Sequence, residues 1–120
     1  MPTAVSEPVT FDSGATVSSE LQVNGRRVVA VTTAVAWTTA DISFEVYDAL
    51  LNGWRPVTDM FAQRLRLTGV PTTESYFMIL PEEADRLVAN TLRLVSDDIS
   101  TGAATAQGSA RTLYVGLQVL

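Results

Sequence analysis

Apolar residues recur at every second position in several short segments of the chain, which is the spacing of a β-strand with one buried face. In the segment 42–47, Ile42, Phe44 and Val46 alternate with polar residues, so we expect a half-buried strand there. Val28 to Val31 is instead an unbroken apolar run, which indicates a strand covered on both faces. Two strands of such different pattern predict the middle of a β-sandwich.

Turn residues separate similar segments at short intervals along the whole chain. We expect strands within 9–11, 18–23, 26–33, 42–47, 54–60, 65–67, 76–80, 92–96 and 111–120. The sequence therefore predicts an all-β fold, a single antiparallel two-sheet sandwich of jelly-roll type with about eight strands.

The pair Asn24-Gly25 marks the strongest predicted turn. Both residue types accept a positive φ at little cost, and this pair is typical of a two-residue hairpin. We therefore expect 18–23 and 26–33 to be antiparallel neighbours.

A second pair, Asn52-Gly53, closes the connection between the strands 42–47 and 54–60. Pro56 lies in the latter strand and has no backbone N–H to donate. We therefore expect that strand to lie at a sheet edge or to begin at Val57.

One short segment has the features of a helix start. Pro81 suits the first helical position, and Glu82, Glu83 and Asp85 place negative charge in the first turn, where the helix dipole favours it. We expect a short helix over 81–89. The same acids could suggest the carboxylate pair of a glycoside hydrolase, but their position at a helix start explains them more simply.

The first eight residues carry two prolines and show no hydrophobic period. We therefore divide the chain into an N-terminal arm, 1–8, and a β-sandwich domain, 9–120. Two interpretations of the arm stay open. It is either a loose tail or a segment that becomes ordered by lying on a neighbouring subunit.

The ionisable residues exclude much of enzyme chemistry. The chain has no histidine and no cysteine, and its 8 basic residues are all arginine. The commonest general base, the thiol and amine nucleophiles and nearly all zinc sites require the residues that are missing. We therefore expect no enzymatic activity and no cofactor.

Net charge and hydropathy restrict the partners. A net charge of -5 argues against binding to nucleic acid, which needs a positive surface. No run approaches the roughly 18 apolar residues of a membrane span, and the N-terminus lacks the pattern of a signal peptide. We expect neither a nucleic acid nor a membrane partner.

Asp97-Asp98 could contribute to a calcium site. Calcium takes roughly six to eight oxygen ligands, however, and two adjacent carboxylates supply few of them. A solvated pair at the start of the loop 97–109 is the simpler interpretation, so we expect no metal.

Four aromatic residues could form a sugar-stacking platform, as sandwich domains often do: Trp37, Tyr47, Trp54 and Tyr76. Large aromatics also fill the ends and edges of sandwiches, and we favour that interpretation. A glycan ligand stays a secondary hypothesis.

Three stretches of the chain resemble a family of small virion proteins of tailed bacteriophages. They read VTFDSGATVSSELQVNGRRVVAV, AWTTADISFEV and GWRPVTDMFAQRLRLT, and a further likeness covers 90–120. The motifs consist of turn glycines and core aromatics. Two positions depart from the family pattern. Ala34 stands where a proline is expected before Ala36-Trp37, and DALLNGWRP replaces a glycine-rich hairpin, so we expect that loop to be specialised.

The resemblance implies a jelly-roll-like decoration or cement protein, which binds the outer surface of the assembled phage head and stabilises contacts between major capsid subunits. It also implies association of copies, often as a homotrimer, and a place on the virion after synthesis in the bacterial cytoplasm. We expect the contacts with the major capsid protein in the arm and in one loop, at Val5, Ser6, Glu7, Pro8, Val9, Leu50, Leu51 and Trp54. A carbohydrate-binding or host-adhesion module of the virion and a tail or baseplate component stay open as alternatives.

Overall fold

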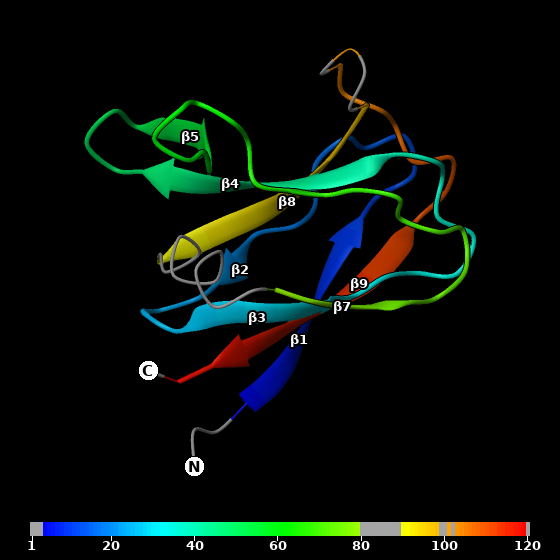
Figure 1. Cartoon of the computed structure of the whole chain (residues 1–120), viewed down its shortest axis with the longest axis horizontal. Coiled ribbons are helices and arrows are strands. Elements are labelled where there is room, and N and C mark those ends of the chain that lie inside the picture. Colours follow the sequence, from blue (N-terminus) through cyan, green and yellow to red (C-terminus); the bar gives the residue numbers. More distant parts are fainter. Residues whose placement is uncertain (1–3, 80–89, 99–100, 102, 120) are drawn as a thin grey trace.

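The computed structural model describes residues 4–79, 90–98, 101 and 103–119, and these form nine strands in two antiparallel sheets (Figure 1). Sheet A contains, in spatial order, β1 (Ala4–Phe11), β9 (Arg111–Gln118), β3 (Arg27–Thr32) and β7 (Tyr76–Met78). Sheet B contains β2 (Leu21–Gln22), β8 (Thr91–Asp97), β4 (Asp41–Asp48) and β5 (Gly53–Pro56), and β6 (Arg66–Leu67) pairs with the first half of β4.

The chain changes sheet at almost every connection. β1, β3, β7 and β9 belong to sheet A, β2, β4 and β8 belong to sheet B, and only β4, β5 and β6 follow one another within one sheet. This order is that of a jelly roll, in which two sheets wind around a shared core. The prediction of an all-β, two-sheet, jelly-roll-like fold is confirmed.

The core lies between the sheets and is filled from alternate positions of the long strands. Its buried residues include Val9, Phe11, Val28, Val31, Ile42, Phe44, Leu92, Leu94, Leu113, Val115 and Leu117. Trp37, in the link between β3 and β4, joins this core. Its ring packs edge-on against Phe11 with centroids 5.2 Å apart, and its indole N–H donates to the Ala40 carbonyl at 3.1 Å.

The two central strands follow their predicted patterns in part. β3 lies between β9 and β7, inside sheet A. Its unbroken apolar run reflects a register shift between Val28 and Ala30, with Val28 and Val31 in the core, rather than two faces packed on the core. β4 buries Ile42 and Phe44, but Ser43 is buried as well. The Ser43 hydroxyl donates to the buried carboxylate of Asp97 at 3.0 Å. Ser43, which points away from the core, is thus covered by polar contacts. The alternation of apolar and polar residues does not predict this.

The prediction of a hairpin at Asn24-Gly25 is wrong, although the turn itself is present. Asn24 and Gly25 have φ of 55° and 77°, and the Arg26 N–H donates to the Val23 carbonyl at 3.1 Å. The turn joins β2 of sheet B to β3 of sheet A, so the strands on its two sides are not paired. β2 pairs with β8 instead.

The connection at Asn52-Gly53 does close a hairpin, because β4 and β5 pair antiparallel from Glu45–Pro56 to Asp48–Gly53. β5 lies at the end of the strand order of sheet B. Pro56 therefore stands in an edge strand, as the sequence predicts.

Residues of the predicted N-terminal arm form part of β1, which pairs with β9 from Ala4–Gln118 to Phe11–Arg111. β1 is an edge strand of sheet A. The Thr10 N–H and carbonyl bond to Ser19, so this residue turns its backbone groups away from β9. Pro8 faces the same way because backbone direction alternates along a strand, and its missing N–H therefore removes no bond from the sheet.

The short helix predicted over 81–89 lies outside the described residues. Within the described part of the chain, no helix has the length and apolar character needed to cross a membrane.

Candidate protein-docking surface

Two turns beside β5 expose large apolar side chains. Leu50 and Leu51 lie in the loop between β4 and β5 and are 96% and 61% exposed. Met60 and Phe61 lie in a small hairpin, 57–65, directly after β5 and are 89% and 76% exposed. We name these pairs the first tip and the second tip. Both lie at the same end of sheet B (Figure 1), separated along the chain by a strand whose four residues span roughly 13 Å.

An aspartate fixes the backbone of the first tip. Asp48 Oδ1 accepts hydrogen bonds from the N–H groups of Leu50 at 2.9 Å and of Leu51 at 3.3 Å. Asn52 takes a positive φ of 53°, and its side-chain oxygen accepts a hydrogen bond from the Tyr47 hydroxyl. Such local side-chain bonds are a common way to hold a turn in one conformation.

A second aspartate holds the second tip in the same manner. Asp59 Oδ1 accepts from the N–H groups of Phe61 at 2.8 Å and Gln63 at 3.0 Å. The Asp59 N–H donates to the Gln63 carbonyl at 2.9 Å, and Ala62, with a φ of 62°, donates to the Asp59 carbonyl at 3.1 Å. Each tip is therefore a turn whose aspartate carboxylate binds two backbone amides.

The hairpin that carries the second tip is tied to sheet B through Asp97 of β8. Arg66 Nη1 lies 2.6 Å from Asp97 Oδ1, and Arg64 Nη1 lies 3.4 Å from Asp97 Oδ2. The Asp97 side chain is only 1% exposed. A carboxylate so removed from water requires these cationic partners and the Ser43 hydroxyl, so Asp97 fixes where the hairpin lies.

Trp54 supports the base of the first tip. It lies opposite Tyr47 across β4 and β5, with ring centroids 5.5 Å apart at 71°. The Arg93 guanidinium carbon lies 4.3 Å from the centroid of the Trp54 ring, and Arg93 Nη2 pairs with Glu45 Oε1 at 2.7 Å. These contacts leave Trp54 half-buried, so it stiffens the hairpin rather than projecting from it.

Large apolar side chains on fixed turns are suited to docking. Scattered exposed leucines are ordinary on protein surfaces, but clustered ones mark interaction sites. Turns that already have their bound conformation lose little conformational entropy on association. The two tips can thus enter an apolar groove on a partner at low entropic cost.

The structure does not bring the two predicted contact segments together. Val5, Ser6 and Pro8 are exposed on β1, whereas Glu7 pairs with Arg26 at 3.5 Å and Val9 is buried in the core. The start of β1 and the β4–β5 loop lie far apart in Figure 1. Leu50, Leu51 and Trp54 are the predicted contact residues that lie at or next to the tips.

The four aromatics of the hypothetical sugar platform are also separated. Trp37 is buried in the core and has no free face. Tyr76 lies on β7 of sheet A, while Tyr47 and Trp54 form their edge-on pair on sheet B. No single platform contains all of them.

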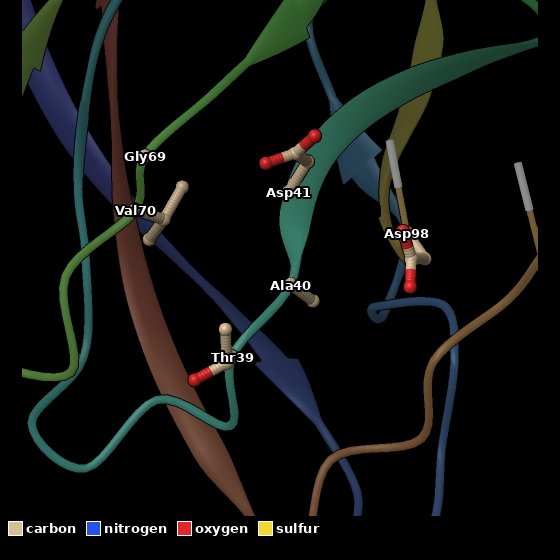
Figure 2. A pocket seen from close by; sticks show the side chains of 6 residues that line it. All are labelled: Thr39, Ala40, Asp41, Gly69, Val70 and Asp98. Carbon is tan, nitrogen blue, oxygen red and sulfur yellow. The ribbon is translucent and has the colours of Figure 1, made fainter. Parts of the chain in front are cut away.

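A pocket of about 160 Å³ lies where the link before β4 meets Gly69, Val70 and Asp98. Asp41 lines it, and burial raises the pKa of this carboxyl; Arg66 opposes that effect, while Asp97 and Asp98 add to it. The side chains of Asp41 and Asp98 lie on separate sides of the pocket (Figure 2). Among the described residues, no group of three or more His, Cys, Asp or Glu side chains could hold a metal ion.

Sequence reasoning did not select the second tip as a contact site. A signal for it was present, because both tips follow an aspartate within a turn, in Asp48-Ala49-Leu50-Leu51 and Asp59-Met60-Phe61. Apolar residues directly after such a turn-forming aspartate have no strand partner to cover them. The acids of 81–89 lie outside the described residues.

No protein-family model, no curated protein and no solved structure matches the chain.

Proposed function

We propose that the chain is a structural virion protein of a tailed bacteriophage, a decoration or cement protein that docks on the outer surface of the assembled head. The sequence resemblance supports the virion assignment. The observation that carries the docking proposal is the pair of apolar tips, Leu50-Leu51 and Met60-Phe61, on turns fixed by Asp48 and Asp59.

The tips supply enough apolar surface for a moderate interaction. Burying one leucine, methionine or phenylalanine side chain contributes roughly 1.5–3 kcal/mol relative to leaving it in water. Four such side chains exceed the entropic cost of association only when the partner groove covers most of them. The partner is therefore an apolar groove at a contact between major capsid subunits, which exists only once the shell has assembled.

A ligand that binds only the assembled shell stabilises that shell by mass action. Several weak contacts from associated copies add by avidity, so no single contact needs high affinity. The acidic net charge suits the outer face of the shell rather than its DNA-filled interior.

The test is co-sedimentation of the purified protein with phage heads that lack it and, separately, with unassembled capsid subunits. We expect binding to heads and not to free subunits. Leu50→Ser with Leu51→Ser, and Met60→Ser with Phe61→Ser, should each weaken binding by about 100-fold or more, because each pair removes two apolar side chains whose burial contributes roughly 1.5–3 kcal/mol apiece. Val35→Ser is the matched control, since Val35 is 66% exposed but lies in the link before β4.

Four results would count against the proposal. Equal binding to free subunits would remove the cement mechanism, and unchanged binding by both tip variants would remove the docking surface. Binding to phospholipid vesicles that is lost in the tip variants would assign the tips to a membrane instead. Enrichment in purified tails rather than heads would favour the tail or baseplate alternative.

A further inference from the structure

The outer face of sheet A carries a row of side chains across all four of its strands. Register places Pro8 opposite Tyr114, Tyr114 opposite Thr32, and Thr32 opposite Tyr76. Opposed residues point to the same face of a sheet, and Leu113 and Val115 point into the core, so this row points outward. Tyr114 and Tyr76 are 49% and 67% exposed. The row is therefore a ridge with two tyrosines.

A lower strip runs beside this ridge, offset from it by two residues on each strand. Ser6 pairs with Gly116, and Gly116 pairs with Ala30. A Cβ added at Gly116 would lie 3.3 Å from the Ala30 Cβ, so only glycine fits there comfortably. On β1, β9 and β3 these small residues make the strip a furrow, and on β7 the register partner of Ala30 is Met78.

The far side of the furrow is bounded by Arg27 and Gln118, which are register partners. Arg27 Nε and Nη2 donate to Gln118 Oε1 at 3.0 and 2.8 Å. The outward surface of sheet A thus has three parallel parts: a ridge, a furrow and a polar wall.

No carboxylate lies on the described part of this face. Its outward positions on β1 and β9 carry Ser6, Pro8, Thr10, Thr112, Tyr114, Gly116 and Gln118. The chain nevertheless contains 13 acidic residues and a net charge of -5, so most contacts between two copies bring like charges together. Carboxylates and lysines are depleted and tyrosine is enriched in protein–protein interfaces. Two copies that meet through the described strand positions of this face therefore bring no carboxylates together.

We propose that the outer face of sheet A binds the same face of a second copy across a two-fold axis. A ridge beside a furrow is self-complementary, because a two-fold rotation lays the ridge of each copy into the furrow of the other. Tyr114 of one copy then packs over Ser6 and Gly116 of the other. The inference specifies the copy-to-copy contact of the proposed function and predicts a pair, whereas the family resemblance implies a trimer.

The test is sedimentation velocity of the full chain between about 1 and 500 µM, a range that includes the Kd of a moderate interface. We expect a reversible monomer–dimer equilibrium. Tyr114→Glu and Ser6→Glu each place a charge on the face and should raise the dimer Kd at least tenfold. Val35→Glu is the matched control, because Val35 is 66% exposed in the link between β3 and β4, outside both this face and the tips, and it should leave the equilibrium unchanged.

Thermal unfolding of each variant as a monomer shows whether it has folded. A chain that stays monomeric over the whole range, a trimer, or a dimer that both face variants retain would overturn the proposal. Head binding is measured separately. If the face variants lose the dimer and bind heads more weakly only through lost avidity, the copy-to-copy contact is separate from the apolar tips. If the tip variants do not change head binding, the proposed docking surface is wrong, but the dimer is still expected.

Discussion

Gln107 lies in the long loop before β9, is fully buried, and connects three parts of the chain. Its amide Nε2 donates to the Ser96 hydroxyl at 2.9 Å and to the Thr38 carbonyl at 3.2 Å, and its Oε1 accepts from the Thr38 N–H at 2.9 Å. The loop, β8 and the link that holds Trp37 are thereby fixed to one another. Buried polar groups of this kind require all their partners.

Replacing Gln107 with leucine should therefore destabilise the fold strongly. The variant leaves the Thr38 N–H and carbonyl and the Ser96 hydroxyl without their bonds, at a cost of about 2–4 kcal/mol in the free energy of unfolding. Urea denaturation followed by tryptophan fluorescence measures this change. Gln63→Leu, at an exposed position, is the control and should change stability by less than about 0.5 kcal/mol. Equal stability of both variants would show that the Gln107 bonds contribute nothing.

At Asp41, in contrast to Gln107, we expect a substitution to raise the stability of the fold. Burial raises the pKa of its carboxyl above the ordinary 3.8, although Arg66 lowers it. One oxygen, Oδ2, is buried without a hydrogen-bond partner. A raised pKa means that the folded state binds this proton more tightly than the unfolded state. The ionised carboxylate therefore lowers stability above its folded pKa, and the loss is relieved as the pH falls toward 3.8.

Asp41→Asn should accordingly raise the melting temperature at neutral pH, because asparagine removes the buried charge while its side-chain oxygen still accepts the Gly69 amide. The difference from wild type should shrink as the pH falls through the folded pKa of Asp41. Thermal scans by circular dichroism over a pH series measure both effects. A lower melting temperature for the variant at neutral pH would show that the ion pair with Arg66 outweighs burial.

These residues mark what the sequence could and could not predict at this scale. Alternation predicted that Ile42 and Phe44 are buried, because their strand has one face on the core. It could not predict that Ser43 is buried too, since that depends on Asp97, Arg64 and Arg66 arriving from distant parts of the chain. The burial of Gln107 could not be predicted for the same reason.

Among the elements, the hairpin 57–65 is held at its base by Val57, which is buried in the core and whose N–H donates to the Phe44 carbonyl at 2.9 Å. Asp97 on β8 adds ion pairs with Arg64 in the hairpin and with Arg66 directly after it. Removing one member of a buried charge pair leaves the other charges without compensation. β8 therefore helps to set the position of the second tip.

Asp97→Ala should lower the free energy of unfolding by about 3 kcal/mol, because the two arginines lose their buried partner. Hydrogen exchange at Phe61 and Gln63 should accelerate as the hairpin loosens. Glu7→Ala is the control, since the Glu7–Arg26 pair at 3.5 Å is far more exposed and should contribute less than about 1 kcal/mol. Unchanged exchange at the second tip would contradict the anchoring role of Asp97.

Turn chemistry was a good guide to where elements end and a poor guide to what they pair with. Asn24 and Asn52 both adopt the positive φ that an Asn-Gly pair predicts. One turn closes the β4–β5 hairpin, and the other carries the chain between sheets. The difference lies in the strands around each turn, because β2 finds its partner in β8, which is far away in sequence.

On the scale of the whole molecule, the number and spacing of the strands sufficed to predict a jelly-roll-like sandwich. Most connections in this fold cross between sheets, so pairing is long-range and cannot be read from adjacent segments. Only one of the two tips of the candidate site could be predicted from the sequence. Leu50 and Leu51 were selected from an unusual loop, whereas the second tip became evident only when the hairpin 57–65 was placed beside β5.

The proposed function requires the apolar tips to contact the assembled shell, and hydrogen–deuterium exchange on head-bound protein tests this directly. We predict that the amides of 48–53 and 59–63 exchange at least tenfold more slowly on the head than in free protein, because docking covers both turns and suppresses their opening. β2 and β8, which lie on the opposite side of β4 from β5, serve as an internal reference and should be unaffected. Unchanged exchange at both tips, with protection elsewhere on the molecule, would contradict the account.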